Sequence, residues 1–353
     1  MPVASAGGRA VVAFDALGAE GGAAAVVEGV ERAVADRITV RVFGRRDELS
    51  ELTGLLGVDV LDTSAVIGND EDPVAAVRSR PESSIVRAAA DVAEGRSAAL
   101  ASPGSTGATM AAALFALKRI RGVQRPALAV QLPAPGLERP VLMLDVGANA
   151  DARASHLVQF ASLGASFASA VLGVERPRVA LLSVGAEPKK GSMLVVEAHE
   201  ALAAADRSGA REFDFLGNVE GGDLLTGAAD VVVTDGFTGN VTLKTIEGTA
   251  KAVGGAVRAA ARSGRRAAAG GLLLRPALGD LRGRLDPDRT GGAILLGLRG
   301  VTVVGHGSAG PEGIANQIRL AAHAAEVDAP ARMAELLAAS GADRAAMRKA
   351  GGS

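Results

Sequence analysis

Short apolar runs alternate with alanine-rich, helix-patterned segments along most of the chain. Most of these runs are continuously apolar, as expected of strands that are covered on both faces. Segments between them, such as "HLVQFASLGASFASAVLG" and "SMLVVEAHEALAAAD", are typical of helices. The alternation predicts an α/β fold with a doubly wound, mainly parallel sheet in two lobes. The nine predicted strands are "AVVAFDALG", "ITVRVFG", "AALASPG", "ALAVQLP", "VLMLDVGAN", "VALLSVG", "FDFLGNVEG", "DVVVTDGFTGN" and "GVTVVGHGS".

The same patterns predict the domain organisation. We expect an N-terminal tail at 1–9, a single α/β unit at 10–328 with a cleft between its lobes, and a C-terminal helix and tail at 329–353. Two uncharged stretches, 97–117 and 155–174, are long enough to span a membrane, but their glycine, serine, histidine and glutamine content favours buried elements of a core. The first apolar run stops at Asp15, so no secretory signal is recognised and we expect a cytoplasmic protein.

Polar residues follow most of the predicted strands. In open parallel sheets, ligands bind beyond the carboxyl ends of the strands, whereas turn chemistry alone explains any single such loop. So many ends with acid or amide side chains predict one large polar cleft. The loops are 15–18, 102–107, 145–149, 185–191, 217–221, 235–240 and 305–308.

The stretch "ASPGSTGATM", 101–110, joins a predicted strand directly to a predicted helix. Free backbone N–H groups and the helix dipole make such a junction able to hold an anion. Serine and threonine are also preferred at helix starts whatever the function, so on this stretch alone a plain N-cap is the favoured interpretation.

Composition removes several classes of chemistry. With 0 cysteines, the chain has no disulfide, thiolate metal site or catalytic cysteine. Its formal net charge of −1 and 48% hydrophobic residues are ordinary for a globular protein and give no sign of nucleic-acid binding. The four histidines have no metal-binding spacing, and no G-x-S-x-G elbow is present, so we expect no metal. Among the histidines, His306 lies in a glycine turn and is the candidate acid, while His199 and His323 have the pattern of ordinary surface helix positions.

Two further glycine-rich stretches have competing interpretations. "GHGSAG", 305–310, matches a dinucleotide-binding fingerprint, but no second strand follows its helix, so a phosphate or backbone turn remains. "GAEPKKGS", 185–192, carries Lys189 and Lys190 at a strand end, where they either contact an anion or face solvent.

The segment 251–289 departs from the α/β pattern and is predicted to be a basic, leucine-rich helical protrusion. Arg258, Arg262, Arg265 and Arg266 recur at helical spacing and would share one face, followed by Leu272, Leu273 and Leu274. Such a segment suits an anionic membrane surface or an acidic partner. A solvated helix with a leucine-packed dimer contact is the alternative.

Taken together, the loops resemble the bacterial phosphate acyltransferase family of phospholipid synthesis, from about residue 10 to 325. The most specific stretches are "FLGNVEG" and "DGFTGNVTLKTIEG"; "ASPGSTGATM", "LDVGAN", "HLVQFASLG", "KKGS" and "GHGS" also match. The resemblance implies a fold like that of the isocitrate and isopropylmalate dehydrogenases, a homodimer and peripheral contact with an anionic membrane. It also implies transfer of a fatty acyl group from acyl carrier protein to inorganic phosphate. Phosphate is then itself the nucleophile, so neither a catalytic cysteine nor a cofactor is needed.

The resemblance also supplies expected site residues. As catalytic residues it suggests Lys190, Asn218, His306 and Asp235. As phosphate- or substrate-binding residues it suggests Asp15, Gly18, Ser102, Gly104, Thr106, Gly107, Asp145, Asn149, Glu220, Thr238, Asn240, Gly305 and Ser308. The arginines and leucines of the protrusion would contact the membrane or the carrier protein.

The first loop, "DALGAEGGA", departs from the family pattern. Ala19 replaces a glycine, Glu20 an aspartate and Ala23 a proline, and Ser105 stands where an asparagine is usual. An alanine lacks the backbone freedom of glycine in a tight turn. A phosphotransacylase acting on acyl-CoA, or a catalytically weak, membrane-associated scaffold of the same fold, therefore stay open as alternatives, and a dehydrogenase is the remaining one.

Overall fold

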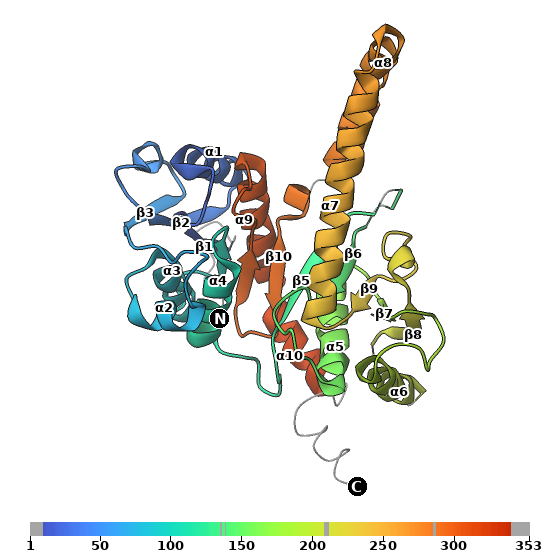
Figure 1. Ribbon diagram of the computed structural model, residues 1–353. Coiled ribbons are helices and arrows are strands. Elements are labelled where there is room, and N and C mark those ends of the chain that lie inside the picture. The colour runs from blue at the N-terminus through green and yellow to red at the C-terminus, as the bar shows by residue number, and fades with distance from the viewer. Residues whose placement is uncertain (1–9, 135, 138, 208–211, 285–286, 340–353) are drawn as a thin grey trace.

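Eleven strands form one continuous sheet through the molecule (Figure 1). The computed structural model describes residues 10–134, 136–137, 139–207, 212–284 and 287–339, so the predicted tail at 1–9 and the last part of the predicted C-terminal segment lie outside it. In sheet order the strands are β3 (Val58–Asp62), β2 (Thr39–Gly44), β1 (Val11–Asp15), β4 (Ala99–Ser102), β11 (Val301–Val304), β10 (Ala293–Leu296), β5 (Ala127–Leu132), β6 (Val141–Leu144), β9 (Val231–Val233), β7 (Arg178–Leu182) and β8 (Asp214–Val219).

Helices cover both faces of this sheet, so the predicted doubly wound α/β architecture is confirmed. The helices are α1 (Gly22–Ala35), α2 (Pro73–Ser79), α3 (Ser84–Ala93), α4 (Thr106–Leu117), α5 (Ala154–Ala170), α6 (Met193–Arg207), α7 (Gly236–Ala261), α8 (Arg265–Arg284), α9 (Pro311–Glu326) and α10 (Ala329–Ala339). Three short 3-10 turns are η1 (Ser50–Leu52), η2 (Gly221–Asp223) and η3 (Pro287–Thr290).

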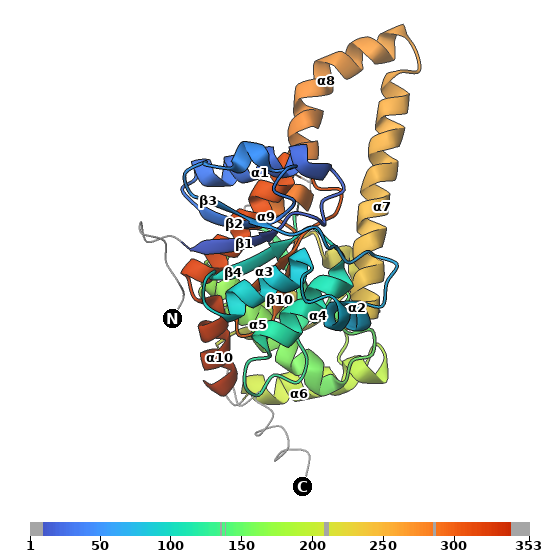
Figure 2. The same cartoon turned by 90° about the vertical axis from the view of Figure 1, so that its left-hand side faces the viewer.

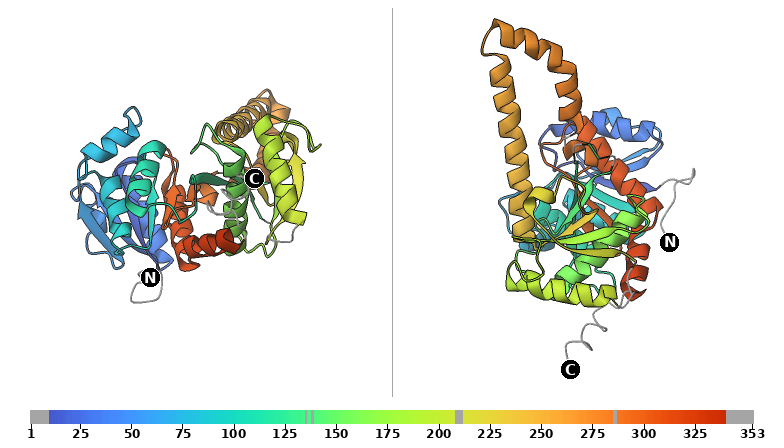
Figure 3. Two further views of the ribbon diagram at one scale, coloured as in Figure 1. Left: turned by 90° about the horizontal axis from the view of Figure 1, so that it is seen from below. Right: turned by 90° about the vertical axis from the view of Figure 1, so that its right-hand side faces the viewer.

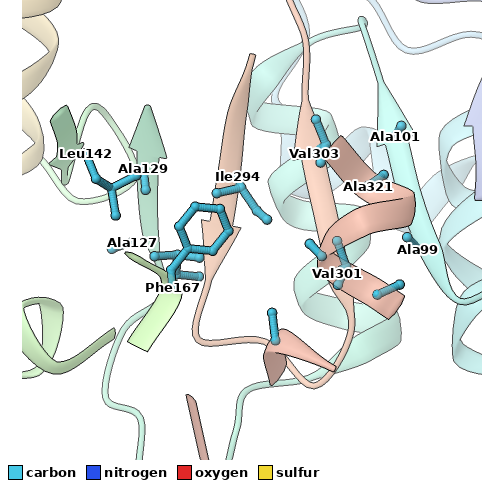
Figure 4. Packing of buried hydrophobic residues seen from close by; sticks show 14 of the residues in the cluster. Ala99, Ala101, Ala127, Ala129, Leu142, Phe167, Ile294, Val301, Val303 and Ala321 are labelled. Carbon is cyan, nitrogen blue, oxygen red and sulfur yellow. The ribbon is translucent and has the colours of Figure 1, made fainter. Parts of the chain in front are cut away.

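Alternate residues of each strand enter two different apolar layers. In β1, Val12 and Phe14 pack with α1 and α9, whereas Ala13 packs with the layer of α2, α3 and α4. Figure 4 shows the first layer running unbroken across the central strands, where Ile294 and Phe167 lie between residues of β4 and β6. This two-sided burial explains why the strands are continuously apolar in sequence.

Strand direction reverses in the middle of the sheet. β3, β2, β1, β4 and β11 are parallel to one another, and β6, β9, β7 and β8 are parallel to one another. Between these two halves, β10 is antiparallel to both β11 and β5, and β5 is antiparallel to β6. The two halves therefore run in opposite directions.

The twist of the sheet offsets this reversal. Six neighbour-to-neighbour steps separate β1 from β9, and a twist of about 20–25° per step turns one half by about 120–150° relative to the other. The carboxyl ends of both halves are thereby turned toward one side of the molecule. Figures 2 and 3 agree, because the helix α2 of the first half and the base of α7 in the second lie on the same side.

The sequence pattern did not predict every element. β3 and β10 are strands beyond the nine predicted, and Gly217 lies inside β8 rather than in the loop after it. The prediction that four arginines share one helix face is wrong. Helix α7 ends at Ala261 and α8 begins at Arg265, so Arg258 and Arg262 lie before the break and Arg265 and Arg266 after it.

Candidate functional site

The predicted site residues separate into two groups, one on each half of the sheet. The first group consists of the loops after β1, β4 and β11, and the second consists of the loops after β6, β7, β8 and β9. The seven loops predicted to form one polar cleft are therefore carried by two separate sets of parallel strands.

At the centre of the first group lies the buried carboxyl group of Asp15. The Ser102 hydroxyl donates a hydrogen bond to Asp15 Oδ2 (2.8 Å), and it accepts hydrogen bonds from the Gly104 N–H (3.1 Å) and the Thr109 hydroxyl (3.2 Å). The second oxygen, Asp15 Oδ1, is buried and accepts no hydrogen bond within 3.5 Å from the residues that the structure describes. Burial raises the pKa of Asp15 above its ordinary value. Asp15 and Ser102 thus form a buried network at the base of the loops rather than an exposed contact.

Close backbone approach joins the three loops of this group. A side chain at Gly18 would place its Cβ 2.3 Å from Gly104 Cα, so only glycine fits there. The Gly305 N–H donates to the Ser102 carbonyl (2.8 Å), and the Glu20 N–H donates to the Gly307 carbonyl (2.8 Å). The first loop, the start of α4 and the His306 turn are therefore one structural unit.

The altered first loop fits this unit without backbone strain. Ala19 is not among the residues with positive φ, so its methyl group is compatible with the turn. The longer carboxylate of Glu20 lies against Gly307, where an added Cβ would be 2.7 Å from Glu20 Oε1. Ala19 and Glu20 are therefore accommodated in the first loop.

The start of α4 is compatible with both interpretations of its sequence, an anion site and a plain N-cap. Ser105 is the N-cap residue, and its hydroxyl accepts a hydrogen bond from the Ala108 N–H (3.4 Å), as a plain cap requires. Within the part of the chain that the structure describes, the N–H groups of Thr106 and Gly107 have no acceptor. Anion binding by these two groups remains a prediction.

His306 lies at the surface of the same unit. Its Nδ1 is 3.2 Å from the Ser308 hydroxyl, and both side chains are exposed. No strand follows α9 in residues 311–339, so the glycine match at 305–310 does not open a complete dinucleotide-binding βαβ unit.

In the second group, Asp145 organises the loop after β6. Its two oxygens accept hydrogen bonds from the backbone N–H groups of Leu128, Gly147, Ala148 and Asn149 and from the Asn149 amide, at 2.7–3.2 Å. Burial raises the pKa of Asp145, against the opposing effect of these hydrogen bonds. In this structure Asp145 and Asn149 hold the loop, since both are buried and bonded to the chain itself.

Two glycines press the start of α7 against that loop. A Cβ at Gly239 would lie 1.9 Å from the Asp145 carbonyl oxygen, and one at Gly236 would lie 2.7 Å from the Asn149 carbonyl oxygen. Asp235 caps the helix, because its carboxylate accepts hydrogen bonds from the Thr238 N–H (2.9 Å) and hydroxyl (2.7 Å). Asn240, in the same first turns, is exposed.

Asn218 and His199 are a buried pair, of which the sequence analysis identified only Asn218 as a site residue. The Asn218 amide N–H donates to the Glu187 carbonyl (2.9 Å), and its oxygen lies 3.0 Å from His199 Nδ1. The expectation that His199 is an ordinary surface residue is wrong, because it is buried where α6 packs on β8. The pair fixes the 185–191 loop, from which the exposed Lys190 extends.

The site residues therefore divide by exposure. Buried side chains hold the loops together: Asp15, Ser102, Asp145, Asn149 and Asn218. Other predicted site residues have exposed polar side chains: Thr106, Lys190, Glu220, Asn240, His306 and Ser308. The backbone of Glu220 is also used, as its N–H donates to Asp223 Oδ2 (3.0 Å) in η2.

Helices α7 and α8 project from the body as a hairpin (Figures 1 and 2). Arg258, Arg262, Arg265 and Arg266 surround its turn and are exposed. Leu272, Leu273 and Leu274 on α8 are 68%, 83% and 57% exposed, which is unusual for three consecutive leucines. Among the described residues, no helix is long and apolar enough to cross a membrane.

Comparison with known proteins decides the family. The model of the family described as "Fatty acid synthesis protein" matches residues 10–332. The chain belongs to this family. Relatives named phosphate acyltransferase include those from Bacillus licheniformis (42% identical, covering 88% of this chain and 93% of the relative) and a Geobacillus species (44%, with the same coverage). A phosphate acyltransferase of Streptococcus agalactiae is 41% identical over 87% of this chain and 93% of its own length.

Solved structures with lower sequence identity to this chain share its fold. A branched-chain phosphotransacylase from Enterococcus faecalis superposes with a TM-score of 0.59 at 16% identity, covering 90% of this chain and 99% of the other. A phosphotransacetylase from Streptococcus pyogenes gives 0.56 at 18% identity, covering 90% and 94%. A 4-hydroxythreonine-4-phosphate dehydrogenase from Klebsiella pneumoniae gives 0.51 at 16% identity, covering 90% and 99%, so the expected dehydrogenase-like fold is confirmed.

Proposed function

We propose that this protein takes a fatty acyl group from the thioester of acyl carrier protein and transfers it to inorganic phosphate. The observation that supports the activity is the family match over residues 10–332, together with relatives named phosphate acyltransferase. A phosphate oxygen attacks the thioester carbonyl, a C–O bond forms, and the C–S bond breaks. The carrier leaves as a thiolate that takes up a proton. Acyl phosphate is the other product.

Such a direct transfer does not require the protein to form a covalent bond with the substrate. Holding phosphate against the carbonyl and stabilising the developing oxyanion supply most of the acceleration. The absence of cysteine from the sequence is compatible with this, because no acyl-enzyme intermediate is needed. We assign phosphate to the free N–H groups at the start of α4, which the helix dipole also favours.

Lys190 and His306 are the side chains we assign to charge and proton transfer. Lys190 is exposed on a loop that the buried Asn218 fixes at the carboxyl end of β7. His306 is exposed in the unit that contains the start of α4, where an imidazolium can protonate the leaving thiolate.

Adjacent lysines provide a matched test of this assignment. Lys190→Ala should lower kcat/KM for phosphate-dependent thiol release by about tenfold or more, as loss of a charged contact to a reacting group does. Lys189→Ala removes the same charge one residue away and should change it by less than about twofold. Equal effects of the two substitutions would remove Lys190 from the site.

The acyl donor is tested directly by competition. Acyl carrier protein and CoA thioesters of the same chain length should be offered together, and carrier-protein thiol should be released first. Preference for acyl-CoA would leave the transferase activity in place and replace the donor. Absence of turnover with both, in a folded protein, would favour the scaffold of the same fold.

We also propose that the protein is a homodimer that contacts anionic membranes through the α7–α8 hairpin. Support comes from the three exposed leucines beside four exposed arginines, and from exposed Phe237, Val241 and Val253 along α7. Replacement of Leu272, Leu273 and Leu274 by serine should abolish sedimentation with phosphatidylglycerol vesicles while thiol release continues. Analytical ultracentrifugation measures the dimer independently.

A further inference from the structure

An open cavity of about 490 Å³ lies between the two halves of the molecule, and none of the residues that line it belongs to the seven loops of the candidate site. Its walls come from the β5–β6 connection, the end of α5, η3 and the exposed side of α9. This volume is within the range of small-molecule sites, which is about 300–1,000 Å³.

Basic and amide groups dominate the polar wall. Arg139, Arg289, Arg319 and His323 all line the cavity, together with Asn316. Of the described residues in the lining, none is an aspartate or glutamate. In a chain whose net charge is −1, such a cluster is a local excess of positive charge.

Among the described residues, two of these arginines are not held in ion pairs, although the charge of Arg139 acts on the nearby Asp230 carboxylate. In the part of the chain that the structure describes, neither Arg139 nor Arg289 forms an ion pair. Arg319, by contrast, is paired with Asp36 (2.7 Å) and Glu312 (2.8 Å). Those pairs orient its guanidinium group and partly neutralise it.

The walls are held in place by bonds between elements. The Asn316 amide donates to the Asp288 carbonyl (3.0 Å), which fixes η3, and with it Arg289, on α9. His323 Nε2 lies 3.2 Å from the Val171 carbonyl oxygen, which ties α9 to the end of α5. A preformed site of this kind binds without the cost of ordering its walls.

Apolar side chains complete the cavity beside the cations. Leu137, Val171, Leu172 and Leu320 line it. An ion such as free phosphate would use only the basic wall, whereas a molecule with a phosphate head and a short hydrocarbon chain would use both. We propose that this cavity binds an amphiphilic phosphate monoester, with its head on Arg139 and Arg289 and its chain on the Leu172–Leu320 side.

The inference does not rest on the proposed function, and it can be tested by calorimetric titration of the full chain. The probes are n-octyl phosphate below its micelle concentration, inorganic phosphate and 1-octanol, at constant ionic strength. Arg289→Gln and Arg139→Gln should each weaken octyl phosphate binding at this site by about tenfold, since charge-assisted hydrogen bonds to phosphate are strong. Arg332→Gln, an exposed arginine on α10 outside the cavity, is the matched control and should leave it unchanged.

A further variant tests the contact between the apolar wall and the hydrocarbon chain of the ligand. Leu320→Ala should weaken octyl phosphate while inorganic phosphate binding stays the same. Octyl phosphate also resembles the product of the proposed reaction, so binding that responds to Lys190→Ala but to neither arginine variant belongs to the candidate site and overturns the inference. Absence of saturable binding also overturns it, as does inorganic phosphate binding as tightly as octyl phosphate.

Discussion

Replacing Gly239 with alanine has an effect on stability that can be worked out from the structure. It lies in the first turns of α7, buried against the loop that Asp145 organises. A Cβ built there is 1.9 Å from the Asp145 carbonyl oxygen and 3.0 Å from Thr234 Cγ2. Non-bonded carbon and oxygen atoms stay about 3.3 Å apart, so Gly239→Ala forces the helix and the loop apart by more than about 1 Å.

Two opposing free energies decide the sign of this substitution. Alanine inside a helix is favoured over glycine by about 0.5–1 kcal/mol. Overpacking against backbone costs about 1–3 kcal/mol, and here the contact is an immobile carbonyl group. The overpacking cost exceeds the helix gain, so the free energy of unfolding should fall.

Gly248, further along the same helix, provides the control. Nothing lies within 4 Å of a Cβ at Gly248, so Gly248→Ala should raise the free energy of unfolding by about 0.5–1 kcal/mol. Because both variants gain the same helix preference, they should differ by the overpacking cost alone, about 1–3 kcal/mol, in urea denaturation. Gly239→Ala should also lower turnover, because the loops of the second group move with α7. Equal stability of the two variants would refute the packing described for the start of α7.

Three further results follow from buried polar groups. Asp91, whose side chain is 1% exposed, accepts hydrogen bonds from Arg41, Arg96 and Ser97, so Asp91→Asn should cost about 2–3 kcal/mol in denaturant melts. Asp59, 58% exposed and paired with the same Arg41, should tolerate Asp59→Asn at under about 1 kcal/mol, and comparable losses would contradict this difference in burial. Because burial raises the pKa of Asp15, its folded form holds a proton more tightly than the unfolded chain, so its contribution to stability is present below about pH 4 and is lost as pH rises toward the raised pKa. The stability of wild type relative to Asp15→Asn should therefore fall as the pH rises above about 4, and a flat difference would show that Asp15 titrates normally. Finally, Asn218→Ala should reduce turnover about tenfold or more with little change in KM for phosphate, because Asn218 fixes the 185–191 loop instead of touching phosphate; a rise in KM alone would place it in the phosphate site.

The sequence was sufficient for the layered α/β architecture and for most strands, because two-sided burial leaves continuous apolar runs. It missed β10 because "AILL" is short and lies between glycines, and β3 because "VDVLD" is interrupted by an acid. The residue pattern of a short strand that is partly exposed to solvent does not differ locally from the pattern of a loop.

The reversal of strand direction had a signal that could have been used. Only eight residues separate β5 from β6, and a parallel crossover needs about a dozen or more. This short connection requires an antiparallel pair. It therefore implies that the loops after β1 and β4 and the loops after β6 and β7 lie on separate halves of the sheet.

The site chemistry was predicted less completely than the residues themselves. Asp145 and Asn149 were expected to orient a ligand, but in the structure their polar atoms are bonded to the chain. Whether a residue faces a ligand or holds a loop depends on contacts far apart in sequence, such as the bond between Asn218 and the Glu187 carbonyl. His199 was missed for the same reason, since its partner lies on another element.

The central claim is that inorganic phosphate accepts the acyl group. The most direct measurement is release of free carrier-protein thiol from acyl carrier protein with and without inorganic phosphate, with identification of the acyl product. We expect phosphate-dependent release, with acyl phosphate formed in equal amount to thiol. Release that is independent of phosphate, or a folded protein that releases no thiol from several acyl chain lengths, would contradict it.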